Sequence, residues 1–131
     1  MSPIEFTIPI LPPSKNTWEG RHWSIRHKQG EELRREIWAA LAGCQYPHPN
    51  TPTPSFTVPV LVEIELHFPD KRRRDVQNYI HPGLLDALVA LGVIVDDSAQ
   101  WMALTVSAVV DGRRATTITI REREAHNENA E

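Results

Sequence analysis

The sequence has a single cysteine and no long apolar run, and each absence narrows the classes of protein to which it can belong. Cys44 is the only thiol among 131 residues, which rules out an internal disulfide and fits a reducing compartment. No apolar stretch approaches the roughly 18 residues of a membrane-spanning helix, and the first residues lack the basic region and apolar core of a signal peptide. We therefore predict a cytoplasmic protein without membrane contact.

The net charge of −3 does not by itself indicate a nucleic-acid partner. The charges are clustered, however, because four consecutive cations occupy 71–74 whereas 122–131 is rich in acids. A length of 131 residues suggests one domain with a modest core. We predict that this domain covers 1–123 and includes a proline-rich loop at 45–57, and that an acidic tail at 124–131 is disordered.

Hydrophobic periodicity predicts four strands and two helices. The strands are expected over 4–10, 58–68, 102–110 and 116–120, and the helices over 24–42 and 78–91. Pro82 suits the first turn of the second helix, and Asp111-Gly112 is typical of a hairpin turn between the last two strands. The order strand, helix, strand, helix, strand, strand predicts an α/β two-layer sandwich, in which both helices cover one face of a mixed sheet.

The strand at 58–68 gives the clearest of these patterns. Apolar residues fall on every second position from Val58 to Phe68, and Glu63, Glu65 and His67 alternate with them. We expect these three polar residues on the solvent face, since successive strand residues point to opposite sides of a sheet.

The stretch 69–100 holds the residues that indicate chemistry. A loop after the second strand carries the cations and Asp75, and Asp96 and Asp97 follow the second helix. If both segments meet at one end of the sheet, Asp75 and Asp97 converge and can hold magnesium, which takes water and substrate oxygens as its other ligands. A metal there would polarise a phosphoryl oxygen and activate water, while the cations hold flanking phosphates. The pattern predicts chemistry on a phosphodiester.

Two segments of this stretch resemble the RusA-type Holliday junction resolvases. They are PDKRRRDVQN at 69–78 and DALVALGVIVDDSAQ at 86–100, and the LPPSKN turn at 11–16 is similar to the family's PPS-x-N element. The resemblance implies a small dimeric endonuclease of phage or prophage origin that cuts branched DNA in recombination and repair. It also implies Mg²⁺ as the cofactor, with Mn²⁺ able to replace it.

The resemblance further implies roles for individual residues. Asp75 matches the first acid of the family's D-x-D-N, Asn78 matches its asparagine, and Asp97 matches the second aspartate of the later acidic pair. Gln77 stands where the family has its second acid, and His81 stands where it has a lysine. The implied catalytic residues are Asp75, Asp97 and His81, the metal ligands are Asp75, Asp97, Asp96 and Gln77, and the DNA contacts are Lys71, Arg72, Arg73, Arg74, Asn78, Lys15 and Asn16.

Three functions stay open at this level. The first is a junction-cutting endonuclease, the second is a branched-DNA binding protein weakened in catalysis by Gln77 and His81, and the third is a metal-dependent phosphohydrolase acting on nucleotides. Among the neighbouring residues, Asp86 is expected to be structural or to lie in an interface, and Asp70 to pair with an arginine. Trp18 and Trp23 are expected to pack, or to stack on an exposed base.

Overall fold

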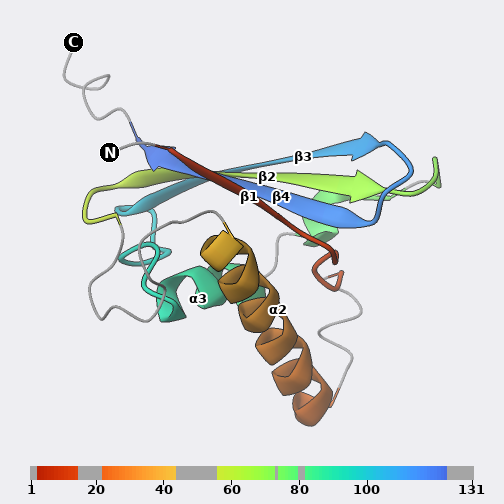
Figure 1. The fold of residues 1–131 in the computed structure, drawn as a ribbon, viewed down its shortest axis with the longest axis horizontal. Helices are drawn as coiled ribbons and strands as arrows, with labels where there is room; N and C mark the ends of the chain where they lie inside the picture. The colour runs from red at the N-terminus through yellow and green to blue at the C-terminus, as the bar shows by residue number, and fades with distance from the viewer. Residues whose placement is uncertain (1–2, 15–21, 44–55, 73, 80–81, 124–131) are drawn as a thin grey trace.

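The computed structural model describes residues 3–14, 22–43, 56–72, 74–79 and 82–123. It contains four strands, two α-helices and a short 3₁₀-helix, η1 (Figure 1). Their bounds are β1 Ile4–Ile8, α2 Trp23–Gly43, β2 Val60–Phe68, η1 Val76–Tyr79, α3 Pro82–Ala90, β3 Met102–Val110 and β4 Ala115–Glu122. The predicted element order is confirmed, and α3 begins at the proline that was expected in its first turn.

The four strands form one mixed sheet in the order β1-β4-β2-β3. β2 is antiparallel to β4 and parallel to β3, while β1 is antiparallel to β4. Both α-helices lie on the same side of this sheet (Figure 1). The two-layer α/β sandwich predicted from the sequence is therefore confirmed.

The core lies between the sheet and the two helices. It is built from the inward residues of β1, β2 and β4 and from one apolar stripe on each helix, Leu33, Ile37 and Leu41 on α2 and Leu84, Ala87 and Leu88 on α3. Each large aliphatic side chain that leaves water here contributes about 1.5–3 kcal/mol to folding. Phe56, which ends the proline-rich segment, is also completely buried, and its N–H donates to the Val93 carbonyl oxygen at 3.0 Å.

The start of α2 is capped by a histidine rather than by one of the usual short polar residues. The backbone N–H of Ser24 donates to Nδ1 of His22 at 3.2 Å, and the Ser24 hydroxyl lies 3.0 Å from the same nitrogen. The His22 carbonyl oxygen accepts from the N–H groups of Ile25 and Arg26. These bonds fix where the helix begins.

The prediction of a hairpin at Asp111-Gly112 is wrong. β3 and β4 do not pair with each other, because β2 lies between them and the 111–114 connection crosses the end of β2. Gly112 does adopt a positive φ of 81°, so the local turn chemistry was read correctly. The Asp111 N–H donates to the Phe68 carbonyl oxygen at 3.2 Å, which fixes the connection against the strand that it crosses.

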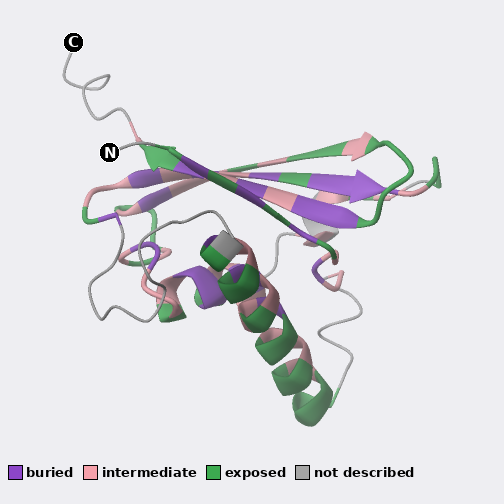
Figure 2. Ribbon diagram, viewed as in Figure 1, coloured by how far each residue is buried: buried purple, intermediate pink, exposed green. Residues whose placement is uncertain are grey.

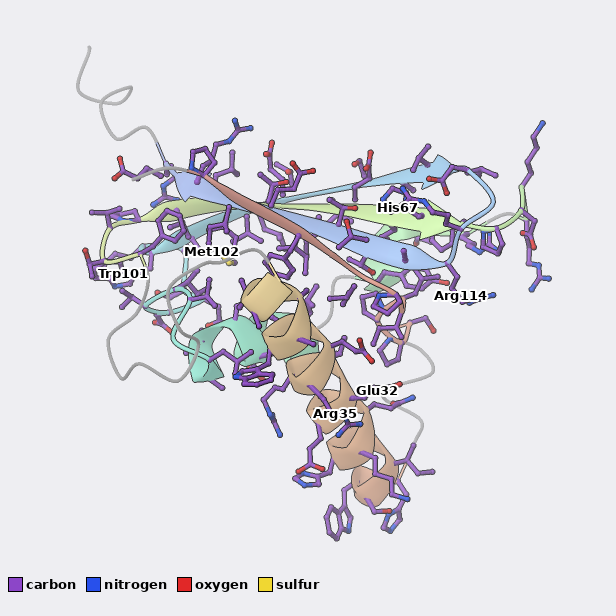
Figure 3. All side chains as sticks on the ribbon, in the orientation of Figure 1. Glu32, Arg35, His67, Trp101, Met102 and Arg114 are labelled. Atoms are coloured by element: carbon purple, nitrogen blue, oxygen red, sulfur yellow. The ribbon has the colours of Figure 1, made fainter. Side chains whose placement is uncertain are left out.

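This connection also overturns the placement of His67 on the solvent face. His67 is only 4% exposed, and it lies on β2 near the end that the connection crosses (Figure 3). Its Nδ1 lies 2.7 Å from Oδ2 of Asp111, and its Nε2 lies 2.9 Å from the Thr117 hydroxyl. Burial alone would raise the pKa of Asp111. Hydrogen bonds from His67 and Arg113 together have the larger effect and hold that pKa below its ordinary value.

None of the helices in the described part of the chain has both the length and the apolar character needed to cross a bilayer. The acidic tail expected at 124–131 and most of the proline-rich loop lie outside the described residues.

Candidate nucleic-acid interface and acidic site

The basic loop that follows β2 presents two of its cations to solvent. Lys71 is exposed, and the side chain of Arg72 is 76% exposed. The Arg72 guanidinium lies 3.8 Å from Oδ2 of Asp70, a long and solvent-exposed ion pair that leaves most of its donors available to phosphate oxygens. The geometry therefore fits the predicted DNA contacts at these two positions.

Arg74 is placed differently from its neighbours, since its side chain is only 13% exposed. Its guanidinium lies 4.3 Å from the centre of the Phe68 ring and donates to the carbonyl oxygens of Asp70 and Arg72. The same group donates to Oδ1 of Asp70 at 2.8 Å. Its described contacts are internal and hold the loop against the end of β2.

Asp70 organises the same loop, as the pairing prediction stated. Its Oδ1 accepts from the N–H of Arg72 at 3.0 Å, besides the bond from Arg74. The backbone hydrogen bond from Arg72 is the main cause that lowers the pKa of Asp70, followed by the side-chain bond from Arg74. Asp70 thus stays ionised and shapes the loop.

The chain turns back beneath the sheet after this loop. Asp75 is exposed immediately before η1, and η1 lies against β3. The Tyr79 ring packs edge-on against Phe68, with the ring centres 5.4 Å apart. The backbone of Gln77 and Asn78 belongs to η1, whereas Lys15, Asn16, Trp18, Arg73 and His81 lie outside the described residues.

The register of β2 and β3 separates the strand ends to which the two predicted acidic segments connect. Phe68 lies opposite Val110 and Val60 opposite Met102. The last residue of β2 and the first residue of β3 are therefore at opposite ends of the parallel strands, about 26 Å apart along the strand direction. The two acidic segments therefore connect to strand ends at opposite ends of the sheet, and the convergence of Asp75 and Asp97 stays a prediction.

The charge of Asp97 acts on the carboxyl group of Asp86 in α3. Burial is the main cause that raises the pKa of Asp86, and the charge of Asp97 raises it further, while Arg34 on α2 opposes both. Sequence reasoning assigned Asp86 a structural or interface role and missed this relation. The relation depends on the path of the chain after α3, which the sequence pattern does not give.

The donor chemistry of these acids fits a hard divalent cation. Asp75 and Asp96 are exposed and Asp97 is half-buried, and carboxylate oxygens are the ligands that magnesium prefers. Within the described ranges, no group of three or more histidine, cysteine or acidic side chains is close enough to hold a metal ion together. Ligation by Asp75, Asp97, Asp96 and Gln77 stays a prediction.

A pocket of 330 Å³ opens between α2 and α3, next to Asp86. Its lining is Trp23, Arg26, His27, Gly30, Arg34, Gly83 and Asp86. Sequence reasoning considered only Trp23 among these residues as a DNA contact. The two arginines and the aromatic side chain are residue types that bind nucleic-acid strands.

Comparison with known proteins shows sequence similarity to several crossover junction endodeoxyribonucleases. The chain is similar to the crossover junction endodeoxyribonuclease rusA of Enterobacteria phage 82, with 28% identity over 91% of this chain and 96% of the relative. The RusA enzymes of Shigella sonnei and Escherichia coli K12 are each 27% identical over the same shares. No family model matches the chain. The chain is thus a relative of the RusA-type crossover junction endodeoxyribonucleases, and the resemblance that its motifs carry is confirmed.

Proposed function

We propose that this protein is a magnesium-dependent endonuclease that resolves four-way DNA junctions by paired phosphodiester nicks. The observation that carries the proposal is the similarity to crossover junction endodeoxyribonucleases over 91% of the chain. The similarity is not confined to a short motif, since it covers 91% of this chain and 96% of the relative. The exposed Lys71 and Arg72 support the same conclusion, because they offer phosphate contacts beside Asp75.

Magnesium fits the proposed site through its oxygen ligands. Asp75 and Asp97 would hold the ion, with Asp96 and the amide oxygen of Gln77 as further donors, and Mn²⁺ would replace it. When bound, the ion supplies charge that polarises the phosphoryl oxygen and lowers the pKa of an attacking water. The cations of the loop hold the flanking phosphates and offset the negative charge that develops in the transition state.

A homodimer follows from the reaction that we propose. Resolution of a four-way junction needs two symmetric nicks, and each chain supplies one set of acids. A two-fold assembly matches the symmetry of the substrate and places one site on each of two strands.

A second candidate is a branched-DNA binding protein with weakened catalysis. Gln77 replaces a carboxylate of the family pattern by a neutral amide, which lowers the negative charge that attracts the metal. His81 replaces a lysine, and a histidine side chain carries less positive charge than a lysine ammonium at neutral pH. Both replacements act on catalysis and leave the basic loop unchanged.

A nicking assay separates these candidates. A labelled synthetic four-way junction, a linear duplex of the same sequence and a free nucleotide are incubated with the protein in magnesium or in excess chelator. The proposal predicts paired nicks in the junction alone, and only with magnesium. Tight junction binding without nicks would support the second candidate, and hydrolysis of the free nucleotide would support the phosphohydrolase instead.

A further inference from the structure

The inner face of α2 changes its chemistry halfway along the helix. Towards the C-terminus this face carries Leu33, Ile37 and Leu41, which are buried in the core. At helical spacing towards the N-terminus, the same face carries Gly30, Arg26 and Trp23, and Arg34 lies where the two parts meet. This half of α2 extends away from the sheet (Figure 1) and is largely exposed (Figure 2). The helix is therefore longer than the core requires.

Gly30 keeps a pocket open on this face. A glycine inside a helix costs about 1 kcal/mol relative to alanine, so its use at this position needs a reason. Packing does not give one, because a Cβ atom built at Gly30 meets nothing within 4 Å. The space beside Gly30 is part of the 330 Å³ pocket between α2 and α3.

The lining of this pocket suits a nucleic-acid strand. Arg26 and Arg34 supply guanidinium groups, whose planar forks match phosphate oxygens. Nε of Arg26 is shielded from solvent and has no hydrogen-bond partner in the described part of the chain. Trp23 is 66% exposed at the mouth of the same face, and an exposed indole offers a stacking surface for a base.

The pocket also lies near Asp97, one of the acids that the proposed function uses. Asp86 forms part of its wall, and the charge of Asp86 interacts with that of Asp97. A strand held by Arg26 and Arg34 would therefore pass beside the acidic site. Arg34 interacts with Asp86 as well, and so offsets the repulsion between that carboxylate and a phosphate.

We propose that the pocket between α2 and α3 binds one strand of the branched DNA, with Arg26 and Arg34 on the backbone phosphates and Trp23 stacked on a base. This inference rests on the proposed function and extends it, because the motifs of the family place the DNA contacts on other segments. The strand enters along the exposed half of α2 and leaves past Asp86.

Adding charge at Gly30 tests the pocket without disturbing the core. Gly30→Glu introduces a carboxylate where the structure has open space, and it should weaken junction binding at least 10-fold. Ala39→Glu is the matched control, since Ala39 is exposed on the same helix and outside the pocket lining. It adds the same charge and should leave the affinity within about 2-fold. Thermal unfolding followed by circular dichroism should show both variants folded.

The salt dependence of junction binding tests the roles of Arg26 and Arg34. Arg26→Gln with Arg34→Gln removes two phosphate contacts and should reduce the slope of log K against log salt by about 1.8. Arg35→Gln, a neighbouring change on α2 (Figure 3) outside the pocket lining, should leave the slope unchanged. Trp23→Ala should weaken binding without changing the slope, because stacking releases no counterions.

The outcomes distinguish the pocket from the proposed function. If the wild-type protein binds and nicks junctions while Gly30→Glu and the double arginine variant match it, the pocket proposal is overturned and the function stands. If the wild-type protein does not bind junctions, both are overturned. Sedimentation of each variant completes the test, since loss of the dimer in Gly30→Glu would show that the pocket receives a second copy of the chain instead of DNA.

Discussion

Neutralising Lys71 and Arg72 should separate the cations that contact DNA from the one that holds the loop. Both side chains face solvent, and Arg72 is 76% exposed, so their removal leaves the internal bonds of Arg74 in place. Each lost phosphate contact reduces the salt slope of binding by about 0.9, and two reduce it by about 1.8. Between 50 and 200 mM salt, wild-type affinity should then fall about 12-fold more than the affinity of Lys71→Gln with Arg72→Gln.

Arg74→Gln is the matched comparison within the same loop. Its guanidinium lies over Phe68 and bonds two carbonyl oxygens, contacts that together contribute about 2 kcal/mol. The variant should lose about that free energy of unfolding in urea and keep the wild-type salt slope.

The assay is fluorescence anisotropy of a labelled junction at five or six salt concentrations, with urea unfolding of each variant alongside. A slope that stays at the wild-type value in the Lys71 and Arg72 variant would show that these cations only solvate a loop. A reduced slope in Arg74→Gln, without loss of stability, would show that the internal geometry of Arg74 does not persist when DNA binds.

Three further changes have defined outcomes. His67→Ala should cost about 2–4 kcal/mol in urea unfolding, because it empties a buried position and removes the hydrogen bonds to Asp111 and Thr117; a cost below about 1 kcal/mol would contradict the burial of His67. The lowered pKa of Asp70 gives stability that is present at neutral pH and is lost as pH falls through the folded-state pKa. Asp70→Asn should therefore lower the free energy of unfolding at pH 7 and match the wild type well below pH 4. An equal difference in the free energy of unfolding at both pH values would contradict this expectation. Gln77→Asp should lower the magnesium concentration for half-maximal nicking, since it restores a carboxylate, and an unchanged requirement would mean that another residue fills that ligand position.

The sequence predicted the elements of this fold better than their pairing. Alternation in 58–68 and the helical spacing of Leu33, Ile37 and Leu41 are local signals of burial, and the structure confirms the apolar buried face of each, whereas His67 is buried against the prediction. The positive φ of Gly112 is also a local feature and is found as expected, although the hairpin itself does not form. Its surroundings are not local, because whether β3 meets β4 depends on whether β2 occupies the place between them.

The candidate site shows the same limit. The clustering of cations in 71–74 is visible in the sequence, but the packing of Arg74 on Phe68 depends on how the loop folds against the end of β2. The relation of Asp86 to Asp97 depends on the path of the chain after α3. Periodicity identifies which residues are buried, and it carries no information on which charged groups from separate segments come together.

The measurement that tests the central claim most directly is the mapping of nicks on a labelled four-way junction by the wild-type protein and by Asp97→Asn, each with magnesium. The account predicts paired, symmetric nicks by the wild type, none in excess chelator, and none by Asp97→Asn although that variant still binds the junction. Symmetric nicking by Asp97→Asn at the wild-type rate, or full activity in chelator, would contradict it.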